Sequence, residues 1–298
     1  MTLQKIGFIG TGVMGASIVK HLLKAGYSVN VYNRTKSKTD ELVGLGAVWQ
    51  ETPEAVTKAS EIIFSIVGYP QDVEEIYYGE TGIFKGATNE KILVDMTTST
   101  PSLAKKLFAT GAENGIEVLD APVSGGDLGA KNGTLTIMVG GTEVAYQKVA
   151  PIFDVFSGKV KLQGAAGSGQ HTKMANQIMI AGTMTGMTEL LVYANAAGLD
   201  LESVLDTVGG GSAQNWSLTN YAPRILREDF TAGFFVKHFV KDLKIALDEA
   251  AKMEIQLPGT TLAKDLYEKL ENQGQGNDGT QALIKLWWPD GNKPVKEE

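Results

Sequence analysis

The chain has 298 residues, of which 43% are apolar and 20% charged, and it has 35 glycines and no cysteine. This composition is typical of a folded globular protein with two domains or one large one, and it excludes a disordered chain. The net charge of -7 argues against a nucleic-acid-binding surface. Without cysteine there is no disulfide, thiolate nucleophile or Cys-ligated zinc.

No segment of the sequence has the pattern of a membrane span or of an export signal. Residues 1–5 lead directly into an apolar segment and a glycine-rich loop, without the features of a secretory signal. The most apolar long segment, 174–197, contains too many polar residues for a membrane span. We therefore expect a cytoplasmic protein with neither a membrane nor a nucleic acid as partner.

The first half of the chain alternates short apolar segments with helical patterns. Strands are expected at residues 5–9, 28–32, 62–67, 92–94, 116–119, 135–139 and 159–162. Helices are expected at 14–25, 37–45, 53–58, 71–77, 101–114 and 143–153. Such alternation, with strands apolar on both faces, is typical of a doubly wound α/β sheet. We predict a doubly wound, Rossmann-type domain over residues 1–163.

The pattern changes after a glycine-rich turn at 164–169. A helical segment then runs to about residue 197, with Lys173 and Glu189 as its only charges. A helix so long and apolar must be covered on most sides, so a second subunit is expected and we predict a homodimer or homotetramer. Residues 201–288 show helical periodicity without a strand pattern. We predict that residues 164–298 form an all-helical substrate-binding and dimerisation domain joined to the first by the long helix.

A glycine-rich loop follows the first predicted strand and opens a helix. It reads Gly10-Thr11-Gly12-Val13-Met14-Gly15. In this context G-x-G-x-x-G is the signature of dinucleotide binding, because the glycines allow the turn, the approach of a pyrophosphate and close helix packing. The free amides of the helix N-terminus then face the anion.

The end of the second predicted strand favours NADP over NAD. NAD-binding chains usually have an acidic residue here for the ribose 2′-hydroxyl. This chain has Asn33-Arg34-Thr35 instead. A guanidinium suits a 2′-phosphate because its forked donors can form paired hydrogen bonds. We expect NADP as cofactor, with NAD possible.

Four blocks of the sequence, in order, resemble the β-hydroxyacid dehydrogenase family. They are GFIGTGVMG (7–15), DAPVSGG (120–126), GSGQHTKMANQ (167–177) and KDL (241–243). The resemblance extends from Ile6 to about Leu286. The family includes 3-hydroxyisobutyrate dehydrogenase, tartronate semialdehyde reductase and glyoxylate/succinic semialdehyde reductases. It implies hydride transfer between a nicotinamide cofactor and a small hydroxyacid or semialdehyde.

The resemblance also implies roles for particular residues. Ser124, Gly125 and Gly126 follow a predicted strand, where exposed amides and a hydroxyl suit a carboxylate, since ligands bind outside the carboxyl ends of strands. The further cofactor-binding residues that it implies are Val67, Gly68, Asp72, Thr98 and Lys241. Gly68 departs from the Leu-Pro of relatives. The segment 276–281 departs from the relatives' pattern of an acid followed by a small polar residue.

Lys173 is the predicted catalytic residue. It is one charge at the start of an otherwise apolar helix, and lysine is rarely buried unless it is paired. Helical spacing places Asn176 and Gln177 one turn later on the same face, as candidate substrate-binding amides. A carbonyl oxygen that gains charge during hydride delivery needs such a proton donor. The three histidines show no metal-ligand spacing, and of these only His171 is near enough in sequence to line the site.

Two alternatives on the same fold remain open at this point. One is a non-catalytic dinucleotide-sensing module, against which Lys173 and its neighbouring amides argue, because a sensor needs no proton donor. The other is an imine reductase, although those relatives typically carry a different residue in place of this lysine. A 6-phosphogluconate dehydrogenase would be much longer than this chain. The blocks do not agree on a substrate within the hydroxyacid family.

Overall fold

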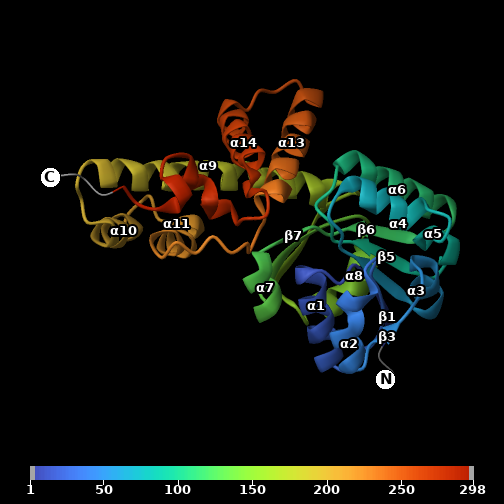
Figure 1. The fold of residues 1–298 in the computed structure, drawn as a ribbon. Helices are drawn as coiled ribbons and strands as arrows, with labels where there is room; N and C mark the ends of the chain where they lie inside the picture. The colour runs from blue at the N-terminus through green and yellow to red at the C-terminus, as the bar shows by residue number, and fades with distance from the viewer. Residues whose placement is uncertain (1–3, 295–298) are drawn as a thin grey trace. The chain divides into compact units, whose positions relative to one another are not determined.

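The computed structural model describes residues 4–294 and divides into two compact units. The first unit ends at Lys173, and the second begins at Met174. The first is an α/β unit built on a nine-stranded sheet in the order β3-β2-β1-β4-β5-β6-β8-β7, with β9 beside β8 (Figure 1). The strands are β1 (Lys5–Ile9), β2 (Ser28–Tyr32), β3 (Val48–Trp49), β4 (Ile62–Ser65), β5 (Ile92–Asp95), β6 (Glu117–Asp120), β7 (Val123–Ser124), β8 (Leu135–Gly140) and β9 (Ser157–Gly164).

The strands from β3 to β6 are parallel, and this is the classical strand order of a dinucleotide-binding domain. β8 runs antiparallel to β6 and β7, while β9 is parallel to β8. The predicted doubly wound domain is confirmed. All seven expected strands are present, whereas the two-residue strands β3 and β7 were not expected, because two residues carry no readable alternation.

Helices cover both faces of this sheet. They are α1 (Val13–Lys24), α2 (Asp40–Gly44), α3 (Pro53–Ala59), α4 (Pro70–Tyr78), α5 (Ile83–Gly86), α6 (Pro101–Glu113), α7 (Gly126–Asn132) and α8 (Glu143–Phe153), with a 3₁₀ turn at Lys36–Thr39. Along β4, Phe64 packs in the core shared with α1 and α8, whereas Ile63 packs in the core shared with α3, α4 and α6. This alternation explains why β4 is buried on both faces.

Local sequence signals set where several helices begin. Thr52, Thr100 and Thr142 precede α3, α6 and α8, and each threonine hydroxyl accepts a hydrogen bond from the backbone amide three residues later, at 3.0–3.1 Å. α3 and α6 also begin with proline, which lacks the amide that a helix start would leave unbonded. These are the predicted helices whose boundaries agree best with the structure. The short helices α5 and α7 were not expected.

The second unit is helical, as expected. α9 (Ser168–Ala196) contributes its first residues to the first unit and continues in the second. The other helices are α10 (Leu201–Gly209), α11 (Trp216–Asn220), α12 (Ala222–Leu226), α13 (Val236–Lys252), α14 (Pro258–Leu270), a π-turn at Glu271–Gln275, and 3₁₀ turns at Thr280–Leu286 and Pro289–Gly291. Phe239 and Leu243 of α13 are fully buried, and Tyr267 of α14 donates a hydrogen bond to the Thr280 carbonyl at 2.9 Å. No helix within residues 4–294 is long and apolar enough to cross a membrane.

Candidate active site

The glycine-rich loop lies where the order of the sheet reverses, between β1 and β4. Gly10 has a φ of +98°, and a side chain there would overlap the Ile66 carbonyl that follows β4. A side chain at Gly15 would overlap the Gly10 carbonyl and the ring of Phe8. These two glycines are therefore required by the fold itself.

Gly12 is a glycine for a different reason. Within residues 4–294, no atom lies within 4 Å of the position that a Cβ would take there. Gly12 is also the N-cap of α1, and it has no side chain to occupy the first amides of that helix. The protein's own packing does not explain this glycine, whereas the approach of a ligand's phosphates to a helix N-terminus does. The loop therefore fits the pyrophosphate of a dinucleotide.

The residues after β2 hold this loop in place. The Asn33 side-chain oxygen accepts a hydrogen bond from the Thr11 amide at 3.0 Å, and its nitrogen donates to the Thr35 carbonyl at 3.0 Å. The Thr11 hydroxyl donates to the Lys38 carbonyl at 3.2 Å. The segment predicted to select the cofactor is thus bonded to the segment predicted to hold its phosphates.

Arg34 projects from the same segment and is 86% exposed. Its Nη1 lies 3.3 Å from Oδ1 of Asp72, which belongs to the first turn of α4. The other oxygen of Asp72 accepts a hydrogen bond from the Tyr69 amide at 3.1 Å. Nearby, the Lys36 ammonium lies 4.0 Å from the centre of the Trp49 ring. The structure therefore brings Arg34 and Asp72 together.

The loops after β4 and β5 carry Val67, Gly68 and Thr98. The Val67 amide donates to the Thr97 hydroxyl at 3.0 Å, which ties the two loops together. The Thr97 amide in turn donates to Asp95 Oδ1 at 3.1 Å. Gly68 and Thr98 are half-buried on these loops.

Two buried carboxyl groups end β5 and β6. Asp95 and Asp120 are register partners, at 3% and 4% exposure. Burial raises the pKa of Asp95 to about 6, although hydrogen bonds from Thr97 and Ser65 oppose the shift. Burial also raises the pKa of Asp120, against hydrogen bonds from the backbone of Gly167 and Gln170. The sequence analysis assigned neither residue a role.

The predicted carboxylate cradle lies between β7 and α7. Ser124 belongs to β7, and Gly125 is the N-cap of α7 with a φ of +129°. Gly126 opens the helix with a φ of +61°. Both conformations favour glycine.

Lys173 lies in the first turns of α9 and is only 6% exposed. This burial differs from that of a lysine that extends into solvent along a helix surface. His171, two residues earlier, is half-buried. His21 has a structural position, because its Nε2 lies 3.1 Å from the Ala130 carbonyl and 3.0 Å from the Lys131 carbonyl at the end of α7.

In the second unit, the predicted residues Gln177 and Lys241 meet at Asp242, and Asn176 bonds Gln177. The Asn176 amide nitrogen donates to Gln177 Oε1 at 2.8 Å, and Gln177 Nε2 donates to Asp242 Oδ2 at 2.7 Å. Lys241 Nζ lies 3.0 Å from the other oxygen of Asp242. Asp242 is 1% exposed, and sequence reasoning had not singled it out. Both ends of the Gln177 amide are therefore engaged within this unit.

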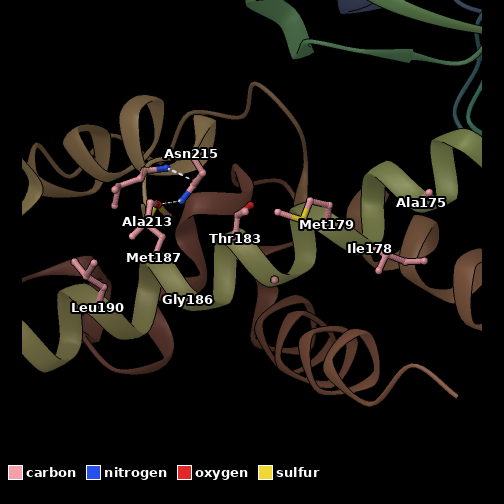
Figure 2. A pocket seen from close by; sticks show the side chains of 11 residues that line it. Ala175, Ile178, Met179, Thr183, Gly186, Met187, Leu190, Ala213 and Asn215 are labelled. Carbon is pink, nitrogen blue, oxygen red and sulfur yellow. Dashed lines mark hydrogen bonds between the residues drawn. The ribbon is translucent and has the colours of Figure 1, made fainter. Parts of the chain in front are cut away.

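An apolar groove of about 690 Å³ runs beside α9 in the second unit (Figure 2). Its floor is α9 and its wall is the segment before and within α11. The lining side chains shown in Figure 2 include Met179, Met187 and Leu190, with Ala213 and Asn215 from the wall. Met179 is 65% exposed. A groove so poor in charged groups does not suit a small carboxylate, so we separate it from the candidate active site.

Comparisons with known proteins agree with this geometry. Residues 5–164 match the family model described as the NAD-binding domain of 6-phosphogluconate dehydrogenase. Residues 167–287 match the model described as the NAD-binding of NADP-dependent 3-hydroxyisobutyrate dehydrogenase. The chain belongs to the β-hydroxyacid dehydrogenase family. It is accordingly an NAD(P)-dependent hydroxyacid dehydrogenase, and the glycine-rich loop around Gly12 lies within the residues that match the NAD-binding domain model.

The relatives of this β-hydroxyacid dehydrogenase span nearly its whole length. It is 48% identical over 281 residues to probable 3-hydroxyisobutyrate dehydrogenase-like 1 of Arabidopsis thaliana, covering 94% of this chain and 84% of the relative. It is 37% identical over 282 residues to 2-hydroxy-3-oxopropionate reductase of Escherichia coli, covering 95% and 96%. A solved structure of 3-hydroxyisobutyrate dehydrogenase from Mycobacterium tuberculosis superposes with a TM-score of 0.87 at 26% identity, covering 96% of this chain and 99% of that one.

Proposed function

We propose that this dehydrogenase uses NADPH to reduce small aldehydes that carry a carboxylate, with Lys173 as the proton donor. The observation that carries the proposal is a buried lysine in the same unit as a dinucleotide loop whose central glycine faces open space. The loop accounts for the cofactor, and the lysine accounts for the proton that the reduced carbonyl needs.

The preference for NADPH rests on the residues after β2. Arg34 takes the place at which an acidic residue would favour NAD, and its guanidinium is 86% exposed and accessible to a phosphate. Lys36 adds a second positive charge. Asn33 bonds the Thr11 amide and is itself held by the Thr35 carbonyl. In this proposal Gly10, Thr11, Gly12, Val13, Met14 and Gly15 bind the pyrophosphate. Val67, Gly68, Asp72 and Thr98 complete the proposed cofactor-binding residues in this unit.

The role of Lys173 follows from the charge that develops during reduction. When bound, NADPH supplies the hydride that passes to the carbonyl carbon. The carbonyl oxygen then becomes an alkoxide and needs a proton, which the Lys173 ammonium donates while its charge stabilises the oxygen. In the oxidative direction the neutral amine accepts that proton, so we expect alcohol oxidation to rise with pH.

The substrate class follows from the donors available for a carboxylate. Ser124, Gly125 and Gly126 offer a hydroxyl and backbone amides, and Asn176 and Gln177 are further candidates. Because Gln177 already bonds Asp242 and accepts a hydrogen bond from Asn176, we propose that Gln177 also orients the Asn176 side chain. Lys241 remains a candidate cofactor-binding residue. Candidate substrates are glyoxylate, succinic semialdehyde, tartronate semialdehyde and methylmalonate semialdehyde.

The assembly we propose is a homodimer or homotetramer formed through the second unit. The groove beside α9 leaves Met179 exposed. Within residues 4–294, no atom lies within 4 Å of where a side chain would begin at Gly182 or Gly186. Glycines on an apolar helix face allow another helix to approach closely. In this proposal residues 1–163 bind NADP, and residues 164–298 bind substrate and associate.

The experiment that tests the function is steady-state kinetics with NADPH and NADH against a panel of C2–C4 aldehyde acids. We expect efficient reduction of at least one of them, with NADPH preferred. Equal efficiency with the two cofactors would contradict the NADPH assignment. Turnover of none of the acids would contradict the substrate class.

A further inference from the structure

Asp120 ties the beginning of α9 to the carboxyl edge of the sheet. Its Oδ1 accepts a hydrogen bond from the Gly167 amide at 2.7 Å, and its Oδ2 accepts one from the Gln170 amide at 2.9 Å. These amides flank Ser168, the first residue of α9. A carboxylate at a helix N-terminus both bonds the free amides and complements the helix dipole.

Two glycines make room for this carboxylate. A side chain at Gly169 would come within 2.8 Å of Asp120 Oδ2, and one at Gly140 would come within 2.9 Å of Asp120 Cγ. The end of β8 and the first turn of α9 therefore both lie so close to the end of β6 that a side chain larger than that of glycine would overlap Asp120. The start of α9 is fixed against the sheet rather than loosely joined to it.

Gln170 makes a second tie, to the loop after β5. It is fully buried, its Nε2 donates to the Thr97 carbonyl at 2.7 Å, and its Oε1 accepts from the Ser99 amide at 3.0 Å. One side chain thus bonds the backbone on both sides of Thr98. Thr97 is itself bonded to Val67 of the neighbouring loop, so the tie extends to the segment after β4.

Lys173 follows Gln170 by three residues along the same helix. At about 1.5 Å per residue this is roughly 4.5 Å along the axis, on nearly the same helix face. A single helical turn therefore connects Gln170, whose side chain bonds the loop around Thr98, to Lys173, the proposed proton donor. Any shift of the first turn of α9 would displace both together.

We infer that Gln170 is a positioning residue, which keeps Lys173 at a fixed distance from the loop around Thr98. The inference rests on the proposed function, in which Thr98 of that loop binds the cofactor. Proton donation and hydride delivery act on neighbouring atoms of one carbonyl group, so the two groups must keep a fixed spacing. A displacement of about 1 Å can cost on the order of 100-fold in rate.

The first test replaces Gln170 with methionine, which has a similar length and cannot form the two bonds. We expect Gln170→Met to lower kcat and the single-turnover rate of hydride transfer by roughly 10- to 100-fold. The Kd for NADPH should change by less than about threefold, because the phosphate loop and Arg34 are untouched. The matched control is Thr172→Val on the same turn, whose hydroxyl donates to the Ser168 carbonyl within the helix, and it should retain parental rates.

The second test, Gln170→Glu, gives a readout that general loss of packing would not give. The protonated carboxyl is nearly isosteric with the amide and can donate to the Thr97 carbonyl while accepting from the Ser99 amide. The ionised form loses the donor. Burial and the neighbouring Asp120 would raise the pKa of the introduced carboxyl, and the ammonium of Lys173, one turn later, opposes this shift. The ratio of variant to parental kcat should therefore increase as the pH falls, and Gln170→Met should show no such recovery.

The outcomes separate this inference from the proposed function. A parent protein that reduces no aldehyde would overturn the proposed function, and the positioning role with it. If the parent is active, Gln170→Met within threefold of parental kcat, or Gln170→Glu with a pH-independent ratio, would overturn the positioning role alone. Hydrogen–deuterium exchange should also show protection lost together at residues 97–99 and 167–173 in Gln170→Met, and loss at one segment only would contradict the tie.

Discussion

The guanidinium of Arg34 lies 3.3 Å from the carboxylate of Asp72, a residue that also accepts a hydrogen bond from the Tyr69 amide. The pair is exposed on the arginine side, so solvent weakens it and the contact is worth at most about 1 kcal/mol. Asp72 thus orients Arg34 at the end of β2 without holding it strongly. A 2′-phosphate can displace or share this contact, because it is a doubly charged acceptor.

We predict that Arg34→Asp removes or reverses the preference for NADPH. The change deletes charge-assisted hydrogen bonds worth on the order of 1.5–3 kcal/mol, so kcat/KM for NADPH should fall by about 10- to 100-fold. Kinetics with both cofactors measure the change. The control is Lys161→Asp, an equal change of charge on β9, and it should leave the cofactor preference intact. An Arg34→Asp variant that still favours NADPH as the parent does would refute this role.

A second prediction concerns recognition of the carboxylate. Succinic semialdehyde should be reduced far more efficiently than butanal, because donors built for a carboxylate are left unpaired by the neutral analogue. Ser124→Ala should raise KM for the acid and leave butanal kinetics unchanged. Comparable efficiency on the two aldehydes in the parent protein would contradict the substrate class.

A third prediction concerns stability and the buried carboxyl of Asp95. Its pKa is raised from 3.8 to about 6 in the folded chain, so the folded state binds this proton more tightly than the unfolded state. The resulting stabilisation is complete below the unfolded pKa and is lost as the pH rises through about 6. The difference between the unfolded and folded pKa values corresponds to about 3 kcal/mol in the free energy of unfolding.

Asp95→Asn removes that titration, so the free energy of unfolding should depend on pH differently in the parent and in the variant. The free energy of unfolding of the parent, minus that of the variant, should decrease between pH 4 and pH 7 in urea denaturation. Asp120 has the same direction of shift, and its charge helps to raise the pKa of Asp95, so the difference between the two proteins also contains the coupling between the two carboxyl groups. A difference that stays constant across this range would show that Asp95 titrates alike in the folded and unfolded chains.

The fourth prediction concerns assembly. Sedimentation at micromolar concentration should show a dimer or tetramer, and Met179→Glu should shift it toward a species of about 32 kDa, because the charge would be buried in an apolar contact. The matched control is Met253→Glu, which alters another exposed methionine, 53% exposed against 65% for Met179, outside the groove. A parent that sediments only as a monomer would refute the assembly.

Features that depend on a few consecutive residues could be predicted from the sequence. The strands 5–9 and 28–32 agree with the structure because each is a short segment rich in β-branched and aromatic residues. The glycine loop could be identified because its spacing is itself the signal. Gln170, Asp120 and Asp242 could not be given roles. Their bonds join residues 73, 50 and 65 positions apart, and such partners become visible only in the folded chain.

The central claim is that Lys173 donates the proton during reduction, and single-turnover hydride transfer in Lys173→Ala tests it most directly. We predict a rate about 10²- to 10⁴-fold below the parental rate, with an unchanged Kd for NADPH, and no recovery in Lys173→Arg, since a guanidinium barely gives up its proton. Lys161→Ala, which removes an exposed lysine of the same unit, should transfer hydride at the parental rate. A Lys173→Ala protein that keeps more than about a tenth of that rate would contradict the claim, and His171 would be the next donor to test.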